Sequence, residues 1–314
     1  MSEEIRRVQV QSISEIAEQV LKFTLTAADG RPLPIFEPGA HIDVYLPNGL
    51  VRQYSLCGKN SDQFYTIAVK RDEASRGGSI SLHTQVKVED FLAISTPRNH
   101  FPLLNSEKKI VFIAGGIGIT PIYSMIQLLQ TQNRDWELHY CARAPEKAAF
   151  YNELIQLDAT KVKTYFSEKP ILDLESLFSS FEDGFNIYCC GPAGLMNAVE
   201  KISEKYTLQK LHFEWFSAPT NQIYENHPFE IELKKSHVVL SVPNDKSILA
   251  VLRENGFSPL SNCEQGLCGS CETALLEGVA DHRDSLLSDE EKDANKTIMI
   301  CVSRAKSNRL VIDI

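Results

Sequence analysis

The chain has 314 residues, of which 43% are hydrophobic and 23% charged, as in water-soluble proteins with two or three domains. Its formal net charge of −9 argues against non-specific nucleic-acid binding, and no apolar run is long enough to span a membrane. The charged N-terminus lacks the apolar core of a signal peptide, and the eight cysteines do not suggest a disulfide framework, so we expect a cytoplasmic protein.

The first hundred residues alternate strand-like segments with turns. Apolar and polar residues alternate in VQVQSISEIA, HIDVYL and FYTIAVK, and the turn-forming sequences DGRPLP and LPNGL separate them. This pattern predicts an antiparallel β-barrel or sandwich over residues 1–103.

Arg52, Tyr54 and Ser55 lie at the end of one of these predicted strands. A guanidinium can bind a phosphate through two parallel hydrogen bonds, a tyrosine ring can pack beside an isoalloxazine, and a hydroxyl can bond its polar edge. An arginine and a tyrosine two residues apart on a strand are also common as a plain surface pair, so this motif alone decides nothing.

A second candidate for phosphate binding is Arg76-Gly77-Gly78-Ser79, which precedes a short predicted helix. Glycines there leave backbone N–H groups accessible at the helix N-terminus, where a phosphate binds well. Either segment could be an ordinary loop, but together with the cysteine loop described below they indicate a flavin that passes electrons to a cluster.

The pattern changes near residue 102. The segment Lys109–Gly116 is a continuous apolar strand typical of a buried parallel sheet, and a helix follows it with apolar residues at Ile122, Met125, Ile126 and Leu129. Two further strands are predicted at Trp136–Ala142 and Asn186–Cys190. This alternation predicts a doubly wound α/β domain over residues 104–218.

A glycine-rich turn, Gly115-Gly116-Ile117-Gly118-Ile119-Thr120-Pro121, joins the first of these strands to its helix. It differs from the GxGxxG fingerprint, but its glycines would let the backbone approach a pyrophosphate, with Thr120 as N-cap and Pro121 as the first helical residue. Cys190-Gly191-Pro192 ends a second parallel strand, so both turns are expected at one crevice. Taken alone, the glycine turn can be a plain tight turn and Cys190 a small buried hydrophobe.

The last part of the chain follows a polar stretch with two prolines, SAPTNQIYENHP, in which we predict a linker at residues 219–228. Residues 229–314 begin with a predicted hairpin, FEIELKKSHVVLSV, and a helix, SILAVLRENG.

Four cysteines in this last part are the most specific motif of the chain. Cys263, Cys268, Cys271 and Cys301 have the C-x4-C-x2-C…C spacing of plant-type [2Fe-2S] ligands. Gly266 and Gly269 would let the loop curl and direct the N–H groups of residues 264–270 at the sulfurs, which tunes the cluster potential. The alternatives are four buried structural cysteines or a zinc site, although zinc sites favour two short cysteine pairs.

These motifs, in this order, resemble the phthalate dioxygenase reductase and vanillate demethylase reductase family of the ferredoxin–NADP reductase superfamily. The resemblance covers nearly the whole chain and rests on RQYSLC, AGGIGITPI, YCCGPAGLM, HFEWF, CEQGLCGSC, DHRD and MICVSRAKS. It implies a multidomain protein with an antiparallel β-barrel flavin domain, a doubly wound α/β nucleotide domain and an α+β (β-grasp) ferredoxin domain placed last.

The resemblance also implies roles for individual residues. FMN would be held by one set of residues, namely Arg52, Tyr54, Ser55, Lys70, Gly77, Gly78 and Ser79. NADH and its contact with the flavin would involve a second set, namely Gly116, Gly118, Thr120, Pro121, Cys190, Gly191 and Pro192. Phe216 would cover the flavin face until nicotinamide displaces it, and Arg143 would touch the adenosine, although a linker anchor and a surface charge are equally ordinary readings of these two.

The implied function is that of a reductase that passes electrons from NADH through FMN and a [2Fe-2S] cluster to a Rieske-type oxygenase. We expect a monomer that binds neither nucleic acid nor a membrane. The partner would act on an aromatic acid such as vanillate or phthalate, or on a quaternary amine such as carnitine. The alternatives are a non-catalytic redox sensor and a reductase of another acceptor, such as a cytochrome P450.

Overall fold

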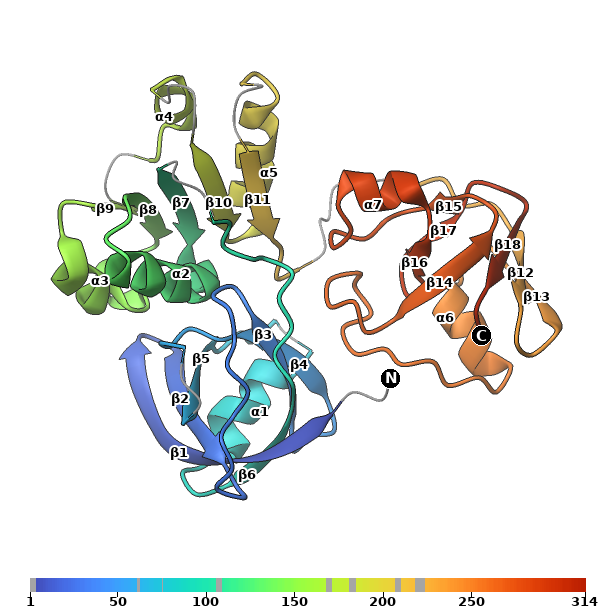
Figure 1. Ribbon diagram of the computed structural model, residues 1–314, viewed down its shortest axis with the longest axis horizontal. Helices are drawn as coiled ribbons and strands as arrows, with labels where there is room; N and C mark the ends of the chain where they lie inside the picture. Colours follow the sequence, from blue (N-terminus) through green and yellow to red (C-terminus); the bar gives the residue numbers. More distant parts are fainter. Residues whose placement is uncertain are drawn as a thin grey trace. The chain divides into compact units, whose positions relative to one another are not determined.

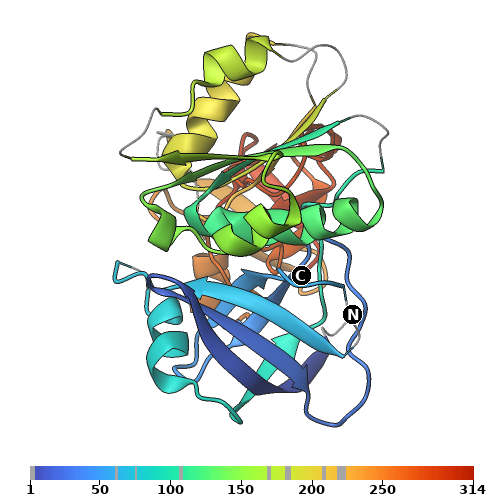
Figure 2. The ribbon, with the colours of Figure 1, turned by 90° about the vertical axis from the view of Figure 1, so that its left-hand side faces the viewer.

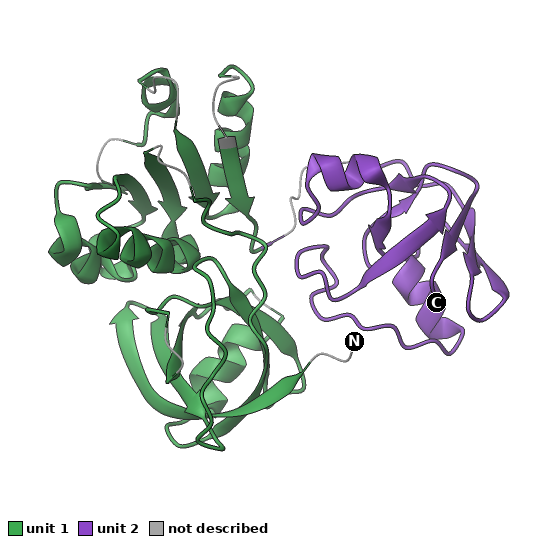
Figure 3. Ribbon diagram, viewed as in Figure 1, with its two compact units in different colours: residues 1–216 green, residues 217–314 purple. Residues whose placement is uncertain are grey.

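The computed structural model describes residues 4–60, 63–74, 76–105, 109–167, 171–180, 185–206, 210–217 and 224–314. The chain forms two compact units, Met1–Phe216 and Ser217–Ile314, which Figure 3 distinguishes by colour. The first half of the predicted linker, residues 219–223, lies outside the described residues, and its second half, from Tyr224, is described. No helix within the described ranges is long and apolar enough to cross a membrane.

The N-terminal part of the first unit is an antiparallel sheet that curves into a barrel (Figure 1). Its six strands run in the order β4-β3-β6-β1-β2-β5. Their bounds are β1 (Ile5–Ala17), β2 (Val20–Ala27), β3 (His41–Tyr45), β4 (Val51–Ser55), β5 (Phe64–Lys70) and β6 (Phe91–Ser95). The inward residues of the strands, such as Phe23, Leu25 and Ile42, form the core, so the predicted barrel is confirmed.

One helix, α1 (Gly78–Gln85), packs beside β5. His83 fastens it there, because its Nε2 lies 2.8 Å from the carbonyl oxygen of Val69. The helix begins at Gly78, directly after Gly77, and so starts earlier than the sequence predicts, since both glycines were expected before it.

The rest of the first unit is a parallel sheet with helices on both faces. Its strands, in the order β11-β10-β7-β8-β9, are β7 (Ile110–Gly115), β8 (Trp136–Ala142), β9 (Val162–Phe166), β10 (Asn186–Cys190) and β11 (Lys210–Glu214). The helices are α2 (Ile119–Thr131), α3 (Tyr151–Asp158), α4 (Leu174–Ser179) and α5 (Ala193–Ser203). Strands β8 and β10 have the predicted bounds, while β9 and β11 widen the sheet beyond the strands predicted from sequence.

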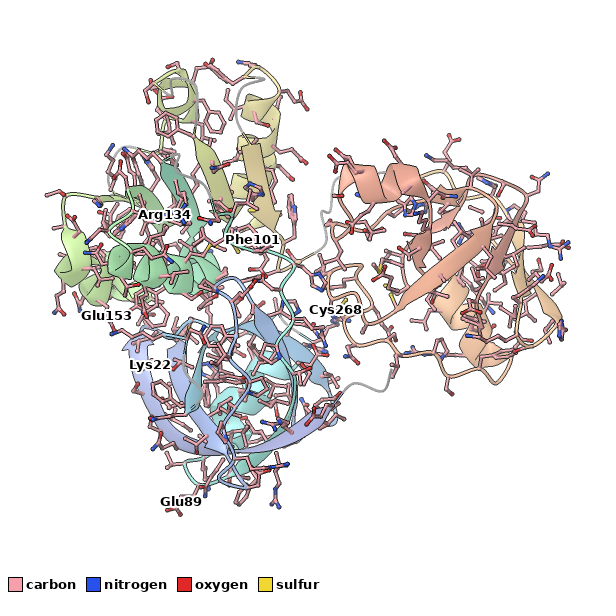
Figure 4. All side chains as sticks on the ribbon, viewed as in Figure 1. Lys22, Glu89, Phe101, Arg134, Glu153 and Cys268 are labelled. Atoms are coloured by element: carbon pink, nitrogen blue, oxygen red, sulfur yellow. The ribbon has the colours of Figure 1, made fainter. Side chains whose placement is uncertain are left out.

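Each face of the sheet has its own core. Phe112, Ile122 and Met125 belong to the core beneath α2, which Phe101, labelled in Figure 4, joins from the segment that leaves the barrel. Figure 2 shows the helices of this face between the parallel sheet and the barrel. Ile113 and Met196 belong to the other core, beneath α4 and α5. The barrel and the parallel sheet therefore share buried surface through α2.

The second unit is a mixed sheet with a helix beside it, which confirms the predicted α+β domain. The strands of the main sheet, in the order β13-β12-β18-β14-β16, are β12 (Phe229–Leu233), β13 (Val238–Val242), β14 (Glu272–Glu277), β16 (Thr297–Met299) and β18 (Arg309–Ile312). A small ribbon, β15 (Ala280–Asp281) with β17 (Arg304–Ala305), and two helices, α6 (Ile248–Glu254) and α7 (Asp289–Ala294), complete it.

A buried arginine holds the start of the second unit in place. The side chain of Arg304 is 4% exposed and donates hydrogen bonds to the carbonyl oxygens of His227, Pro243 and Lys246. Its guanidinium also lies 5.1 Å from the centre of the Phe229 ring. The segment entering β12 is thus fastened to the loop between β13 and α6.

We expect Arg304→Ala to destabilise the second unit by about 3 kcal/mol, because three carbonyl groups lose a charged donor in part-buried hydrogen bonds. Urea unfolding followed by circular dichroism measures this change. Arg309→Ala is the matched control, since Arg309 is half-exposed and pairs with Glu232 at the surface, where a pair contributes about 1 kcal/mol or less. Equal losses for the two variants would contradict the anchoring role of Arg304.

Candidate functional site

The four predicted cluster ligands come together in the second unit. Cys263, Cys268 and Cys271 lie in the loop between α6 and β14, on which Figure 4 labels Cys268, and Cys301 follows β16. All four are buried, with 2–8% of their surface exposed, and all are free thiols. The local sequence and the strand pairing of β14 with β16 thus place distant residues at one point.

The four thiols are arranged as two pairs. A hydrogen bond from Cys268 lowers the pKa of Cys263 to about 6, with help from backbone N–H groups of the loop and against the effect of burial. In the second pair, a hydrogen bond from Cys301 lowers the pKa of Cys271. The donors have raised pKa values, because each shares its proton with a partner sulfur. Each pair therefore contains one readily formed thiolate, the form that binds metal.

This arrangement fits a binuclear cluster. No three His, Cys, Asp or Glu side chains in the described ranges converge on one metal position, as a mononuclear site would require. A [2Fe-2S] cluster has two irons and takes four cysteine ligands, so two thiol pairs are a suitable donor set. The backbone N–H groups of the cysteine loop also fit a cluster, since the N–H of Gln265 donates to the sulfur of Cys263 at 3.3 Å.

Gly266 makes the curl of this loop possible. Its φ of +69° is in the left-handed region, and an added Cβ would lie 2.6 Å from a methyl group of Val302 and 3.0 Å from Cα of Asp284. Gly269 also has a positive φ, of +72°, as the loop prediction requires. A side chain at position 266 would push the loop away from the segment that carries Cys301.

The residues predicted to hold the flavin phosphate lie together in the barrel. Arg52 packs against the first residue of α1, because a Cβ on Gly78 would lie 2.6 Å from its Cγ. Gly77 has a φ of +89°, and the amide of Asn48 bonds its carbonyl oxygen at 3.1 Å. The guanidinium and the N-terminus of α1 can therefore meet the same phosphate.

The other predicted flavin residues differ in exposure. Ser55 is buried at the end of β4, and burial raises the pKa of Tyr54, so its phenol stays neutral. Lys70 is exposed at the end of β5, and Ser79 Oγ lies 3.1 Å from the backbone N–H of Asp72. Roles of these side chains toward FMN remain predictions.

The two predicted nicotinamide turns touch at the point where the strand order of the parallel sheet reverses, between β7 and β10. A Cβ on Gly118 would lie 2.3 Å from the carbonyl oxygen of Cys190, and one on Gly115 would lie 2.5 Å from Cδ of Pro192. Thr120 is buried, and its hydroxyl donates to the carbonyl of Ile117 at 2.9 Å. The turns thus meet at the carboxyl ends of these strands, where a sheet of this kind forms its ligand crevice.

The prediction for the start of α2 is wrong in one detail. The helix begins at Ile119 with Gly118 as its N-cap, so Thr120 is the second helical residue and Pro121 the third. A short 3-10 turn, Gly116–Gly118, precedes the helix and makes the chain helical earlier than the Thr-Pro pattern suggests. Pro121 is still within the first turn, where its missing N–H costs nothing.

Tyr140, which the sequence motifs did not indicate, supports the glycine turn through a hydrogen bond from its hydroxyl. Its hydroxyl lies 3.1 Å from the carbonyl oxygens of both Gly116 and Ala149. Next to Ala149, Phe150 adopts a φ of +57° and stacks on Tyr123 with ring centres 4.3 Å apart. Only the folded structure reveals this support, because the tyrosine lies on β8, the strand after the turn.

Glu214 is a second residue whose importance the sequence did not indicate. It ends β11 beside Cys190, with which it pairs in register, and its Oε2 is buried without a hydrogen-bond partner among the described residues. Burial raises the pKa of Glu214 to about 8, and burial together with this carboxyl raises the pKa of Cys190 well above its usual value. At neutral pH the crevice is therefore lined by an uncharged thiol and a largely protonated carboxyl.

Phe216 and Arg143 are exposed near the same edge of the sheet. Phe216 follows β11 and is 42% exposed, and Arg143 follows β8. Gly191 and Pro192 lie on the β10 turn, with Pro192 exposed. Strand-end position predicted the two turns together, whereas Phe216 and Arg143 were assigned only by the resemblance, and both follow carboxyl ends of parallel strands.

Comparison with known proteins identifies the family. Residues 112–201 match the oxidoreductase NAD-binding domain, and residues 231–306 match the 2Fe-2S iron-sulfur cluster binding domain. A crystal structure of phthalate dioxygenase reductase, described as modular for electron transfer from pyridine nucleotides to [2Fe-2S], is 41% identical, with a TM-score of 0.73 over 99% of this chain and 98% of that one. The chain belongs to the phthalate dioxygenase reductase family. It is an oxidoreductase with an NAD-binding domain and a 2Fe-2S domain.

Two other relatives extend the comparison. The carnitine monooxygenase reductase subunit of Escherichia coli (strain K12) is 44% identical over 98% of both chains. An intact type IV self-sufficient cytochrome P450 monooxygenase is 38% identical, with a TM-score of 0.92. That match covers 99% of this chain, which spans only 41% of the longer protein. Homologous reductases thus occur both as separate subunits and as part of a larger monooxygenase.

We expect Gly118→Ala to raise the KM for NADH at least about tenfold, a loss of ~1.4 kcal/mol in binding, because the new Cβ forces the two turns apart. Steady-state NADH oxidation with ferricyanide as acceptor measures this effect. Gly194→Ala is the matched control on α5, where nothing described lies within 4 Å of an added Cβ. An unchanged KM in Gly118→Ala would contradict the crevice as the nucleotide site.

Glu214 predicts a pH dependence of stability. Its pKa is about 8 in the folded protein and 4.5 in a model peptide, so the folded state holds a proton that the unfolded state releases. The resulting stabilisation is complete below pH 4.5 and is lost as the pH rises through 8, by up to about 1.4 kcal/mol per pH unit. Calorimetry between pH 5 and 8 should show a flatter decline for Glu214→Gln. The exposed Glu175→Gln should decline like the wild type, and identical slopes in all three proteins would refute the assignment.

Proposed function

We propose that this chain is the reductase component of a two-component oxygenase, which takes electrons from NADH through FMN and the [2Fe-2S] cluster to a Rieske-type oxygenase. The observation that carries the proposal is that one chain contains both kinds of site. The second unit has two thiol pairs, and the first unit has the glycine-rich turns at the start of α2 and an α1 N-terminus suited to a phosphate. Such a chain can collect an electron pair in one unit and deliver single electrons from the other. FMN, when bound, supplies the conversion between hydride and single-electron transfer.

The chain's own residues would bind and orient the two nucleotides. Arg52 and the N–H groups at the start of α1 would hold the FMN phosphate, while Tyr54 and Ser55 contact its ring. The N–H groups at the start of α2 would hold the NADH pyrophosphate, close to the backbone because Gly116 and Gly118 lack side chains. Thr120, Cys190 and Phe216 would then border the nicotinamide.

The neutral state of Cys190 and Glu214 suits this role. An uncharged crevice does not repel a hydride donor or attract water in the way that a buried carboxylate would. The thiol supplies a small apolar surface for the nicotinamide ring rather than a nucleophile. Hydride transfer requires no general acid or base, which agrees with the lack of a nucleophile–base pair in the predicted motifs.

The partner oxygenase would act on a small molecule. The 44% identity to a carnitine monooxygenase reductase subunit supports a quaternary amine such as carnitine. The likeness to phthalate dioxygenase reductase supports an aromatic acid such as phthalate or vanillate. We further propose that the chain works as a cytoplasmic monomer and docks its partner near the cysteine loop.

A cytochrome P450 is the second candidate acceptor. The TM-score of 0.92 to a self-sufficient P450 monooxygenase supports this alternative, since the similar part of that protein belongs to the same chain as a cytochrome P450. A redox sensor without turnover is less well supported, because the residues of the nicotinamide crevice are all present. Reconstitution with a Rieske oxygenase and with a P450, under identical NADH supply, distinguishes the two acceptors.

An anaerobic NADH titration of the purified protein, followed by visible absorbance, tests the proposed function. We expect flavin and iron–sulfur bands to bleach together and about three electrons to be taken up per chain, two by the flavin and one by the cluster. The same titration with NADPH should require a higher concentration. A spectrum that NADH does not bleach would favour a sensing protein.

We expect Cys268→Ser to keep NADH-dependent flavin reduction and to lower electron delivery to the oxygenase at least about a hundredfold, since a cluster ligand is lost. Stopped-flow absorbance measures the first step and cytochrome c or oxygenase turnover the second. Cys141→Ser is the matched control, because Cys141 is a partly exposed thiol on β8 outside the cysteine loop. Undiminished delivery in Cys268→Ser would overturn the route through the cluster.

A further inference from the structure

A buried carboxyl group supports the cysteine loop from outside. Asp284 is 4% exposed and follows strand β15, in the DHRD motif that has no role in the proposed electron route. Its Oδ2 accepts the backbone N–H of Leu287 at 2.9 Å and that of Leu286 at 3.3 Å. These bonds close a tight turn over residues 284–287, as the side chain of an aspartate does when it caps a turn.

The turn is bonded to the centre of the cysteine loop. The backbone N–H of Ser285 donates to the carbonyl oxygen of Gly266 at 3.2 Å. Cα of Asp284 comes so close to Gly266 that a Cβ there would lie 3.0 Å from it. On its other side, Gly266 packs against Val302, the residue after Cys301, because an added Cβ would lie 2.6 Å from a Val302 methyl group. The peptide group that packs against the segment of the fourth cysteine is therefore held by the turn that Asp284 closes.

A second bond joins the same carboxyl group to the segment that carries Cys301. The hydroxyl of Ser303 lies 3.4 Å from Oδ1 of Asp284 and accepts the backbone N–H of Arg283 at 3.1 Å. Ser303 is fully buried and its own N–H bonds the carbonyl oxygen of Met299. Asp284 thus contacts both segments that supply cysteines. It meets the cysteine loop at Gly266 and the segment of Cys301 at Ser303.

Asp284 also brings a carboxyl group close to the cysteine loop, because a Cβ on Gly266 would lie 3.1 Å from Cβ of Asp284. It accepts hydrogen bonds from two backbone N–H groups and one hydroxyl, which suits a carboxylate. Among the described residues its ion-pair partner is His282, whose Nδ1 lies 3.8 Å from Oδ1. A buried carboxylate with so distant a partner opposes the addition of an electron nearby.

We propose that Asp284 is a positioning residue of the [2Fe-2S] centre, which fixes the Gly266 peptide against the segment of Cys301 and keeps the cluster potential low. The proposal rests on the proposed function only in assuming that the four cysteines hold the cluster. Asp284 and Ser303 act through the cysteine loop of the second unit, whereas the residues predicted to hold flavin and nucleotide belong to the first unit. The loss of Asp284 or Ser303 is therefore expected to change the cluster and to leave the flavin reaction intact.

The test is a potentiometric titration of the full chain, with the reduced cluster followed by electron paramagnetic resonance. Asp284→Asn keeps the shape of the side chain and removes its charge, so we expect the cluster to be reduced more easily. The equilibrium constant for reduction should rise by up to about tenfold, which corresponds to a potential about 59 mV more positive for one electron. Asp284→Ala also loses the turn, and we expect an iron chelator to remove its iron at least about threefold faster. Ser303→Ala should give a smaller acceleration with a nearly unchanged potential.

Asp313→Asn is the matched charge control, because Asp313 lies at the surface of the same unit and pairs with Lys235 at 2.8 Å. If Asp284→Asn has the same potential as Asp313→Asn, and Asp284→Ala and Ser303→Ala lose iron at the wild-type rate, the proposal is overturned. NADH reduction of the flavin should be equal in all variants. A wild-type chain without an iron–sulfur signal would instead overturn the cluster itself, which separates this failure from that of the positioning role.

Discussion

Two functional regions of this chain depend on backbone segments that approach too closely for any side chain. At the crevice of the α/β domain, Gly118 lies where a Cβ would reach 2.3 Å from the carbonyl of Cys190. In the cysteine loop, Gly266 lies where a Cβ would reach 2.6 Å from Val302. In both places the two segments lie so close together that we expect backbone N–H groups near the glycine to reach a ligand held between the segments. Nucleotide and cluster binding thus rely on main-chain donors, which are rigid and carry no charge of their own.

The two regions differ in their electrostatics. The crevice contains Cys190 and Glu214, whose pKa values are raised by burial, and both are protonated at neutral pH. In the cysteine loop, hydrogen bonds lower the pKa of Cys263 and Cys271. A neutral crevice suits the transfer of a hydride, and a set of available thiolates suits iron. Opposite shifts of thiol pKa values therefore distinguish the two halves of the proposed electron route.

Supporting residues complete each region from a neighbouring strand or turn. Tyr140 on β8 bonds the carbonyl of Gly116, and Asp284 closes the turn that bonds the carbonyl of Gly266. In each case the support acts on the carbonyl of a peptide while the binding region uses N–H groups nearby. This common arrangement explains why residues outside the recognisable motifs are expected to influence affinity and potential.

Local sequence determined the elements and the ligand types of this protein. Apolar periodicity predicted β8 and β10 with their bounds, and cysteine spacing predicted a loop whose thiols now lie together. Both signals are local, because strand periodicity and ligand spacing are written in consecutive residues. The N-cap of α2 was wrong because a 3-10 turn precedes the helix, and that turn depends on contact with Cys190. Only the tertiary structure decided that Tyr140 supports the glycine turn, that Oε2 of Glu214 is buried without a hydrogen-bond partner among the described residues, and that Asp284 reaches the cysteine loop. These facts depend on strand order and on segments distant in the chain, and no local pattern encodes which of them will be neighbours.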